Sequence, residues 1–255
     1  MRVLSLFDGM SCAQIALSRA GVNVEQYYAS ELDKFAIKIT QKNFPNTVQL
    51  GDVRDVATSA VDKIDFLVGG SPCQGFSFAG KQLNFDDPRS KLFFEYARIL
   101  EELKPEFFLL ENVRMSPLSQ NVISERLGVE PILINSSLVS AQNRQRLYWT
   151  NLPVKQPEDK NIFLRDILEG EWVSDRDKSY CIDANYYKGG NLKNYFEKSR
   201  RQLVFSKAGL CQVGVTGLGG NGWPKPVYHP EGKSPTLLSR EGTPKIVIGN
   251  DQWRK

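Results

Sequence analysis

Histidine is almost absent from this chain. His229 is the single histidine among 255 residues, which argues against histidine-based catalytic triads and histidine-rich metal sites. The four cysteines are widely spaced and form no CxxC pair. Neither a zinc site nor a disulfide framework is therefore indicated, and the sequence implies no metal. Free thiols of this kind suit a reducing cytoplasm.

Long hydrophobic runs are also missing. No apolar stretch approaches the roughly 20 residues that span a bilayer. The apolar N-terminal run is interrupted at Asp8, too soon for a secretory signal. We therefore expect a cytoplasmic protein without a membrane partner. Its length allows one full α/β domain with a smaller lobe attached.

Positive charge is unevenly distributed along the chain. Residues 1–150 carry 16 basic and 17 acidic residues, whereas residues 151–255 carry 17 basic and 12 acidic residues. A nearly neutral first part and a basic second part indicate that the second part meets a polyanion. A solvated surface would produce the same imbalance.

Strand-like and helix-like segments alternate through residues 1–150. The apolar patterns predict strands at residues 3–7, 27–29, 48–50, 64–68, 107–110, 131–135 and 146–150. They predict helices at residues 13–20, 34–43 and 87–103. Such alternation predicts a doubly wound, mainly parallel sheet with helices on both faces. Beyond Pro153 no period is sustained, which predicts a small irregular lobe, and a strand-like pattern resumes only at residues 245–248.

The most informative segment follows the fourth predicted strand. Gly69 and Gly70 end that strand, and the chain then turns through Pro72 into Cys73. Ligands of α/β sheets bind in the crevice at the carboxyl ends of the strands, so a nucleophilic cysteine would belong here. The alternative is a buried structural cysteine.

Three acidic residues follow the first three predicted strands. The turn after Asp8 lacks both the glycine spacing of a dinucleotide fingerprint and a Walker lysine, so it is not expected to cradle phosphate. Glu31, 23 residues further on, suits ribose hydroxyls, and Asp52 can accept from an adenine amino group. Two such carboxylates without a phosphate site indicate an adenosyl cofactor, S-adenosylmethionine. Each acid could instead be a helix N-cap.

A carboxylate and two arginines complete the candidate site. Glu111 ends the fifth predicted strand and could donate a proton beside a cysteine nucleophile. Arg144 and Arg146 alternate along a predicted strand, which would point both the same way to hold a substrate. The alternatives are a helix cap for Glu111 and surface positions for the arginines. With no histidine to activate Cys73, the set suits conjugate addition to a polarised ring better than peptide cleavage.

These motifs together resemble the cytosine-C5 DNA methyltransferases of bacteria and phages. The resemblance runs in order through most of residues 1–150, with some likeness to the animal de novo branch. The matching segments are Phe7-Asp8-Gly9-Met10-Ser11, Glu31-Leu32, Asp52-Val53, Pro72-Cys73-Gln74, Gly80-Lys81-Gln82, Phe85 to Phe94, Glu111-Asn112-Val113 and Gln142 to Arg146. It implies the S-adenosylmethionine-dependent methyltransferase fold, with a target-recognition lobe.

The resemblance also implies a mechanism and a set of site residues. Cys73 would attack C6 of a cytosine flipped out of duplex DNA, Glu111 would act at N3, and Arg146 and Arg144 would hold the base. The implied cofactor contacts are Phe7, Asp8, Gly9, Met10, Ser11, Cys12, Glu31, Leu32, Asp52, Val53, Pro72 and Leu92. The implied DNA contacts are Gln74, Ser77, Lys81, Arg89 and Arg144.

We accordingly expect three regions: a catalytic and cofactor-binding domain at residues 1–153, a target-recognition region at 154–235 and a return toward the catalytic domain at 236–255. The family ordinarily continues with a helix and a Gly-Asn-rich turn that completes the cofactor pocket. Because this sequence ends where that segment is expected to begin, we expect either a truncated chain or a second polypeptide that completes it. A catalytically weak DNA-binding subunit and an RNA cytosine methyltransferase are the alternatives to a DNA methyltransferase of a phage or a restriction-modification system.

Overall fold

The chain divides into two units. The computed structural model describes residues 1–72, 92–170, 172–182, 195, 197–206, 212–218, 224–228 and 245–246. Unit 1 comprises residues 1–135 and 145–157, and unit 2 comprises residues 136–144 and 158–255. The boundary after residue 157 lies close to the predicted one at 153, but the turn at 136–144 belongs to unit 2.

Unit 1 is built on a seven-stranded sheet with the strand order β3-β2-β1-β4-β5-β7-β6. Every neighbouring pair is parallel except the two pairs that β7 makes with β5 and β6. The chain winds outward from β1 in one direction and from β4 in the other, so a switch point lies between these two strands. The strands are β1 (Arg2–Leu6), β2 (Gln26–Ser30), β3 (Val48–Gln49), β4 (Phe66–Gly69), β5 (Phe107–Val113), β6 (Ile132–Asn135) and β7 (Gln145–Thr150).

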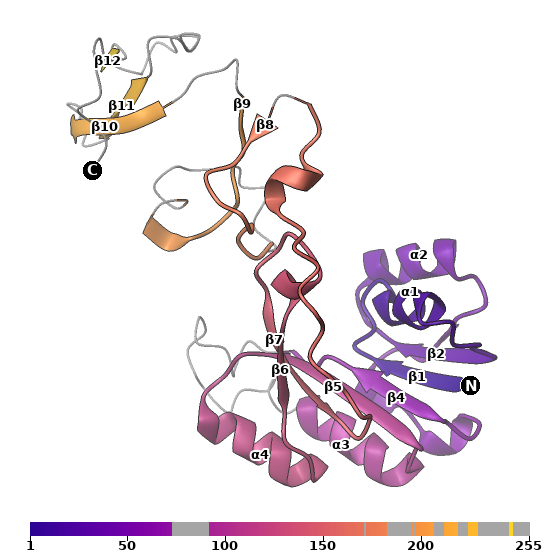
Figure 1. Cartoon of the computed structure of the whole chain (residues 1–255). Coiled ribbons are helices and arrows are strands. Elements are labelled where there is room, and N and C mark those ends of the chain that lie inside the picture. Colours follow the sequence, from indigo (N-terminus) through magenta and orange to yellow (C-terminus); the bar gives the residue numbers. More distant parts are fainter. Residues whose placement is uncertain are drawn as a thin grey trace. The chain divides into compact units, whose positions relative to one another are not determined.

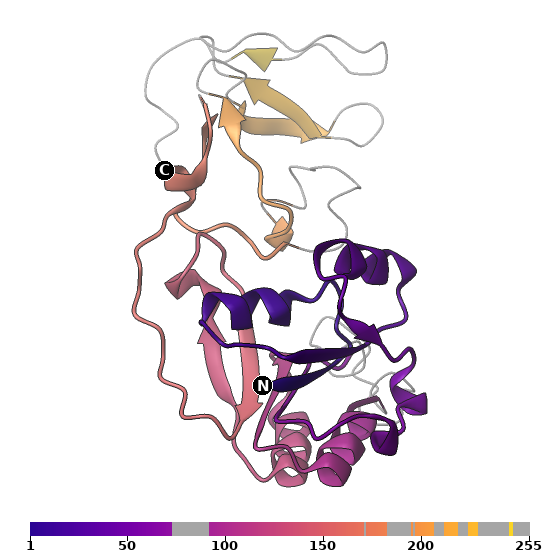
Figure 2. The ribbon, with the colours of Figure 1, turned by 90° about the vertical axis from the view of Figure 1, so that its right-hand side faces the viewer.

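Helices cover both faces of this sheet, as predicted. Helices α1 (Cys12–Arg19) and α2 (Lys34–Asn43) lie on one side, and α3 (Leu92–Leu103) and α4 (Pro117–Leu127) on the other (Figures 1 and 2). The larger core, which includes the fully buried Trp149 and Tyr96, spans the elements on the α3 side. Within the described residues, no helix has the length and apolar character needed to cross a membrane.

Two elements of unit 1 differ from the sequence prediction. Helix α4 was not predicted, because two of its four buried residues are serines, Ser119 and Ser124, which hide the apolar period. The Ser124 hydroxyl accepts a hydrogen bond from Trp149 Nε1 at 3.0 Å. This bond pairs the buried hydroxyl of Ser124 with the buried indole N–H of Trp149. Strand β5 also runs past its predicted end, so Glu111 lies inside the strand, opposite Tyr148 of β7.

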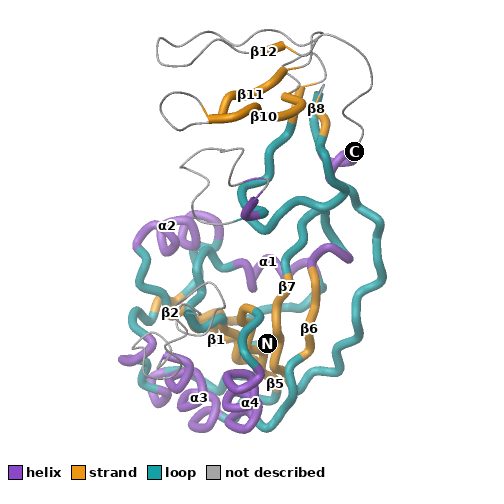
Figure 3. The backbone as a smooth tube through the Cα atoms, turned by 90° about the vertical axis from the view of Figure 1, so that its left-hand side faces the viewer, coloured by secondary structure: helices purple, strands orange, loops and turns teal. Residues whose placement is uncertain are grey.

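Unit 2 contains short strands and irregular chain, in line with the predicted irregular lobe. Strands β8 (Trp172–Val173) and β9 (Phe205–Ser206) form one pair, and β10 (Gln212–Leu218), β11 (Pro224–Tyr228) and β12 (Lys245–Ile246) form a three-stranded sheet (Figure 3). Because β12 pairs with β11, the described part of residues 236–255 stays within unit 2. The expected return of this segment toward the catalytic domain stays a prediction.

A stacked cluster joins two segments of unit 2. The Arg176 guanidinium lies 3.9 Å from the Tyr180 ring centroid and 4.9 Å from that of Tyr195, and it pairs with Asp175 at 2.8 Å. The Tyr195 hydroxyl donates to Asp175 and accepts from Gln202 Nε2 at 2.8 Å. Burial, together with the Asp175 carboxylate, raises the pKa of Tyr195 to about 12. The cluster therefore holds residues 175–180 against Tyr195 and Gln202 while the phenol stays neutral.

Candidate active site

A pocket of about 350 Å³ lies in unit 1 where the sheet changes direction. Its walls come from the segments that follow β1, β2, β3 and β4, and from the first residue of α3. The lining residues are Phe7, Ser30, Glu31, Leu32, Gly51, Asp52, Val53, Arg54, Pro72 and Leu92. This is the crevice in which doubly wound sheets bind their ligands.

The predicted cofactor residues divide into two groups. Seven of them line the pocket: Phe7, Glu31, Leu32, Asp52, Val53, Pro72 and Leu92. The other five, Asp8, Gly9, Met10, Ser11 and Cys12, are not among the lining residues. Ser30, Gly51 and Arg54 were missed, although each directly follows or precedes a predicted residue.

The loop after β1 has an unusual backbone conformation that side-chain hydrogen bonds stabilise. Phe7, Gly9 and Ser11 have φ angles of 57°, 60° and 58°, in the left-handed region that costs most residues energy. The Asp8 carboxylate stabilises this loop, because it accepts from the Tyr27 hydroxyl at 2.8 Å and also from the Ser11 hydroxyl. Thr40 of α2 donates to Ser11 at 3.2 Å. Asp8 is thus engaged within the protein, and its neighbour Phe7 lines the pocket.

Glu31 organises the backbone at the end of β2. Its Oε2 accepts from the Gly9 amide at 2.7 Å, and its Oε1 accepts from the Leu32 and Asp33 amides at 2.7 and 2.8 Å. A carboxylate offers about four acceptor positions, so one remains for a ligand hydroxyl. The carboxylate is fixed by three backbone donors before any ligand arrives. Asp33, rather than Glu31, is the N-cap of α2, where it accepts from Phe35 and Ala36.

Asp52, which also lines the pocket, forms an ion pair with Arg54. Its Oδ1 accepts from the Arg54 amide at 2.9 Å and from Arg54 Nε at 3.0 Å, while Arg54 Nη2 contacts Oδ2. The side-chain hydrogen bond from Arg54, followed by the backbone one, lowers the pKa of Asp52 below its ordinary value. Asp52 also caps the 3-10 helix η1 (Val53–Asp55). Asp52 is therefore a helix N-cap, which the sequence left open as an alternative, and it is also a residue that lines the pocket.

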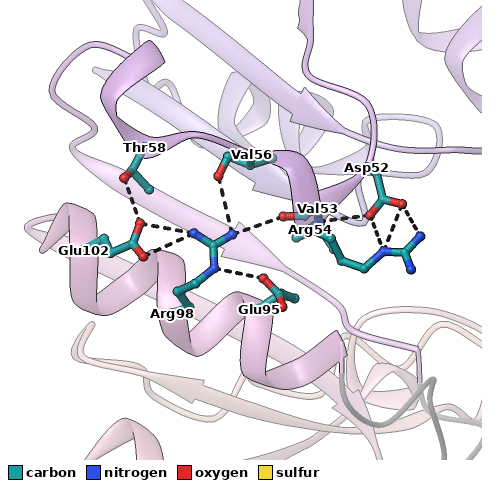
Figure 4. A network of polar contacts seen from close by, with 8 residues as sticks. All are labelled: Asp52, Val53, Arg54, Val56, Thr58, Glu95, Arg98 and Glu102. Atoms are coloured by element: carbon teal, nitrogen blue, oxygen red, sulfur yellow. Dashed lines mark hydrogen bonds and ion pairs between the residues drawn. The ribbon is translucent and has the colours of Figure 1, made fainter.

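Polar side chains of α3 hold the backbone of η1 in place (Figure 4). Arg98 Nη2 donates to the carbonyls of Val53 and Val56, both at 3.4 Å. Arg98 is itself oriented by ion pairs to Glu95 at 2.9 Å and Glu102 at 3.1 Å. Helix α3 therefore contributes Leu92 to the pocket lining and, through Arg98, holds the backbone of Val53, which is also a lining residue. Sequence reasoning missed Arg98, because nothing in its helical spacing indicates a contact 45 residues away.

Glu111 and Arg146 form an ion pair across two strands. Arg146 Nε lies 2.6 Å from Glu111 Oε1, and the Arg146 and Glu111 side chains are 16% and 34% exposed. Arg146 also donates from Nη1 to the Gln145 carbonyl at 2.8 Å, which restricts its rotamer. Arg146 pairs with Val113 in the ladder, so the two charges meet diagonally on one face.

The end of β4 closely approaches Glu111. A Cβ atom at Gly70 would lie 3.1 Å from Glu111 Oε2, so only glycine leaves the carboxylate in this position. On the other face of β5, the buried Asn112 donates to the Ser71 carbonyl at 3.3 Å and to the Ser71 hydroxyl at 3.2 Å. Both contacts hold the chain just before Pro72. Asn112 was missed as a functional residue, although an asparagine in an apolar strand signals a buried hydrogen-bond partner.

Arg144 does not lie on the strand, contrary to the sequence prediction. The ladder between β6 and β7 ends at Asn135 and Gln145, because the next residues coil into the 3-10 helix η4 (Ser136–Leu138). Arg144 Nη1 donates to Cys181 Sγ at 3.3 Å, within unit 2. Cys73, Gln74, Ser77, Lys81 and Arg89 lie outside the described residues.

The strand order and the pocket at the carboxyl ends define the fold of the S-adenosylmethionine-dependent methyltransferases. A profile of the family described as C-5 cytosine-specific DNA methylase matches residues 1–207. The chain belongs to this family. Its fold is also similar to that of a Spodoptera frugiperda DNMT2 mutant, with a TM-score of 0.50 and 24% identity over 66% of this chain and 60% of that one.

Individual relatives agree with this assignment. The chain is 31% identical to the orphan methyltransferase M.SPRI of Bacillus phage SPR, over 95% of this chain and 64% of that protein. It is 30% identical to the type II methyltransferase M.HhaI of Haemophilus parahaemolyticus, over 95% of this chain and 75% of that protein. With M.NlaIV of Neisseria lactamica the identity is 33%, over 62% of this chain and 43% of that protein.

Proposed function

We propose that the chain transfers a methyl group from S-adenosylmethionine to C5 of a cytosine flipped out of a specific site in duplex DNA. One observation carries the proposal: the pocket and the Glu111–Arg146 pair lie at the same edge of the sheet, where the parallel strands end and the antiparallel strand β7 begins. Family membership supports the same reaction. A basic region after residue 150 supports a nucleic acid as the substrate.

The pocket fits an adenosyl cofactor with a positive charge. Its lining contains two carboxylates, Glu31 and Asp52, and apolar side chains such as Phe7, Leu32 and Leu92. Glu31 retains an acceptor position for a ribose hydroxyl, and Asp52 stands where it could exchange an Arg54 contact for an adenine amino group. When bound, S-adenosylmethionine supplies an electrophilic methyl group on a sulfonium. No metal is part of this proposal.

The proposed chemistry begins at Cys73. The thiolate adds to C6 of the cytosine, while Glu111 provides a proton or hydrogen bond at N3, so electron density moves to C5. C5 takes the methyl group, loses its proton to a base such as water, and the C6–sulfur bond then breaks to release Cys73. Arg146, held by Glu111 and by the Gln145 carbonyl, is suited to bind the O2 atom of the base.

Contacts to DNA follow from the family motifs. We propose that Gln74, Ser77, Lys81, Arg89 and Arg144 contact the strand around the flipped base, with unit 2 supplying target recognition. Flipping is required because neither C5 nor C6 is accessible to a thiolate within the base stack. Neither a regulatory subunit nor an RNA methyltransferase is favoured by the matches to DNA-modifying relatives.

The proposal is tested by product analysis. The chain is incubated with methyl-labelled S-adenosylmethionine and unmethylated genomic DNA, and the nucleosides are separated after digestion. We expect all the label in 5-methyldeoxycytidine. Label on an exocyclic nitrogen, or labelling of RNA but not of DNA under the same conditions, would contradict the proposal.

Replacing Gly70 with alanine is expected to impair catalysis more than folding. The φ angle of Gly70 is not in the left-handed region, and the new Cβ would displace only the movable Glu111 carboxylate. The carboxylate must move by a few tenths of an ångström, and because a 1 Å misplacement can cost about 100-fold in rate, we expect a loss of rate below about 100-fold. In Gly69→Ala, by contrast, the Cβ would meet the Leu6 carbonyl at 3.0 Å and the buried Tyr96 ring at 3.1 Å. That variant should lose about 1–3 kcal/mol of stability. Thermal unfolding measures the stability of both variants, and initial rates measure their methyl transfer. Equal losses of stability and of rate in the two variants would contradict this prediction.

Replacing Arg98 with methionine is expected to weaken cofactor binding about 3- to 10-fold. The change removes two hydrogen bonds to the η1 backbone, each of which contributes about 1 kcal/mol at most. Titration calorimetry with S-adenosylhomocysteine measures the effect. Arg126→Met is the matched control, because Arg126 pairs with Glu101 at the surface of α4. If both variants bind like the unmodified chain, Arg98 does not position the pocket.

A further inference from the structure

The turn between β6 and β7 is a well-bonded element of unit 2. We call this turn, residues 136–144, the hairpin tip. Within it, the Ser136 amide donates to the Arg144 carbonyl at 3.0 Å, and the Ser136 hydroxyl donates to the Gln142 carbonyl at 2.9 Å. The Ser140 hydroxyl donates back to the Ser136 carbonyl at 2.8 Å. The tip continues directly into β7, two residues before Arg146.

A second segment of unit 2 pairs with this tip. The Asn143 amide donates to the Ser179 carbonyl at 2.9 Å, and the Ser179 amide donates to the Ala141 carbonyl at 2.7 Å. Gln142 and Ser179 thereby form a parallel bridge. Further along the same segment, Cys181 Sγ accepts from Arg144 at 3.3 Å. Residues 179–181 therefore follow the tip along its length to Arg144.

The side chain of Lys178 connects the hairpin tip to other backbone of unit 2. Its ammonium donates to the carbonyls of Ser137 at 2.7 Å, Ser140 at 3.2 Å and Ile162 at 2.7 Å. An ammonium has three donors, so all of them are used within the protein. Its charge also lies 5.3 Å from the centroid of the Phe163 ring. A half-buried lysine that is bonded in this way is suited to hold the tip and the backbone at Ile162 to its own segment rather than to contact phosphate.

We propose that Lys178 is a positioning residue for the methyl-transfer reaction. It fixes the hairpin tip, and through the tip it sets the direction of Arg144 and the first residues of β7, which carry the Arg146 partner of Glu111. This proposal depends on the proposed function for its effect on rate, but not for its effect on the tip.

Two measurements on Lys178→Met in the full chain test the inference. The first is amide hydrogen exchange of the peptide covering residues 136–144. We expect exchange at least about 10-fold faster, because the tip loses two of its bonds to the rest of unit 2. This readout is independent of activity, so it stands even if the unmodified chain transfers no methyl group and the proposed function fails.

The second measurement is steady-state kinetics on duplex DNA, with rates divided by the fraction of chain that binds S-adenosylhomocysteine. We expect kcat to fall about 10-fold with the KM for DNA within about twofold of its original value. The dependence of DNA binding on salt should not change. Lys155→Met, at an exposed position, is the control for loss of one positive charge and should behave like the unmodified chain.

Three outcomes would overturn the inference. Unchanged exchange in the tip would show that Lys178 does not fix it, and unchanged kcat would show that fixing it does not matter for catalysis. A salt slope reduced by about one unit, with kcat unchanged, would identify Lys178 as a phosphate contact instead. If Lys178→Met does not fold, Lys178→Arg keeps the charge but cannot place three donors around one point, and it should give a smaller loss in the same direction.

Discussion

Replacing Cys73 with serine is expected to lower the rate of methyl transfer at least about 1000-fold while cofactor binding is retained. A hydroxyl is a far weaker nucleophile than a thiolate, and the chain has no histidine near this motif to activate it. Cys73 itself lies outside the described residues, and the structure describes the chain up to Pro72, the residue before it. Gly70 lies against Glu111, and Pro72 lines the pocket.

The Cys73→Ser variant should be compared with the unmodified chain in three measurements. Single-turnover transfer gives the rate, titration with S-adenosylhomocysteine gives cofactor affinity, and thermal unfolding reports the fold. We expect only the first to change. A variant that transfers methyl groups within about 10-fold of the original rate would exclude Cys73 as the nucleophile.

Replacing Glu111 with glutamine is expected to reduce kcat about 100- to 10,000-fold, the range typical of a lost general acid. Glutamine has nearly the same shape and can still accept from Arg146 Nε, but it cannot supply a proton at N3 of the base. Because Glu111 is not among the pocket-lining residues, cofactor affinity should stay the same. The effect should therefore appear in the chemical step alone.

Glu101→Gln is the matched control for this experiment. Glu101 lies on α3 and pairs with Arg126 at the surface, so its replacement should leave kcat unchanged. If Glu111→Gln keeps the original kcat, Glu111 serves only to hold Arg146.

The sheet of unit 1 could be predicted from sequence because its strands are short apolar runs, each ended by glycine or a polar residue. Helix α2 was predicted at its observed bounds, since Pro45 follows its last turn. Helix α4 was not, because buried serines replace part of its apolar face. Strand β5 was predicted too short, because Glu111 and Asn112 are polar but still pair with β7.

The site was predictable where chain order dictates position. Parallel strands end at one edge of a sheet, so acids that follow successive strands must lie close together, and Glu31 and Asp52 do line one pocket. Their partners were not predictable. Arg98, Asn112 and Lys178 donate to backbone carbonyls that lie 38 to 45 positions away, and Lys178 also donates to one 16 positions away. No sequence pattern marks a carbonyl as an acceptor.

The position of Arg144 could not be predicted from the alternation of side chains along a strand alone. Alternation placed Arg144 and Arg146 on one side of one strand. The strand instead begins at Gln145, and Arg144 belongs to a tip whose shape depends on Lys178 and Ser179. These residues lie more than 30 positions later, in a region without a hydrophobic period. The direction of Arg144 is thus set by tertiary contacts within unit 2.

A covalent trap gives the most direct test of the central claim, that Cys73 adds to the cytosine ring before methyl transfer. Duplex DNA containing 5-fluorocytosine is incubated with the chain and S-adenosylmethionine, and the denatured, digested complex is mapped by mass spectrometry. Fluorine cannot leave as a proton does, so we predict a stable adduct on the peptide that contains Cys73, with the methyl group already on the base. Methyl transfer to ordinary DNA without any adduct here, or an adduct on Cys12, Cys181 or Cys211 instead, would contradict the account.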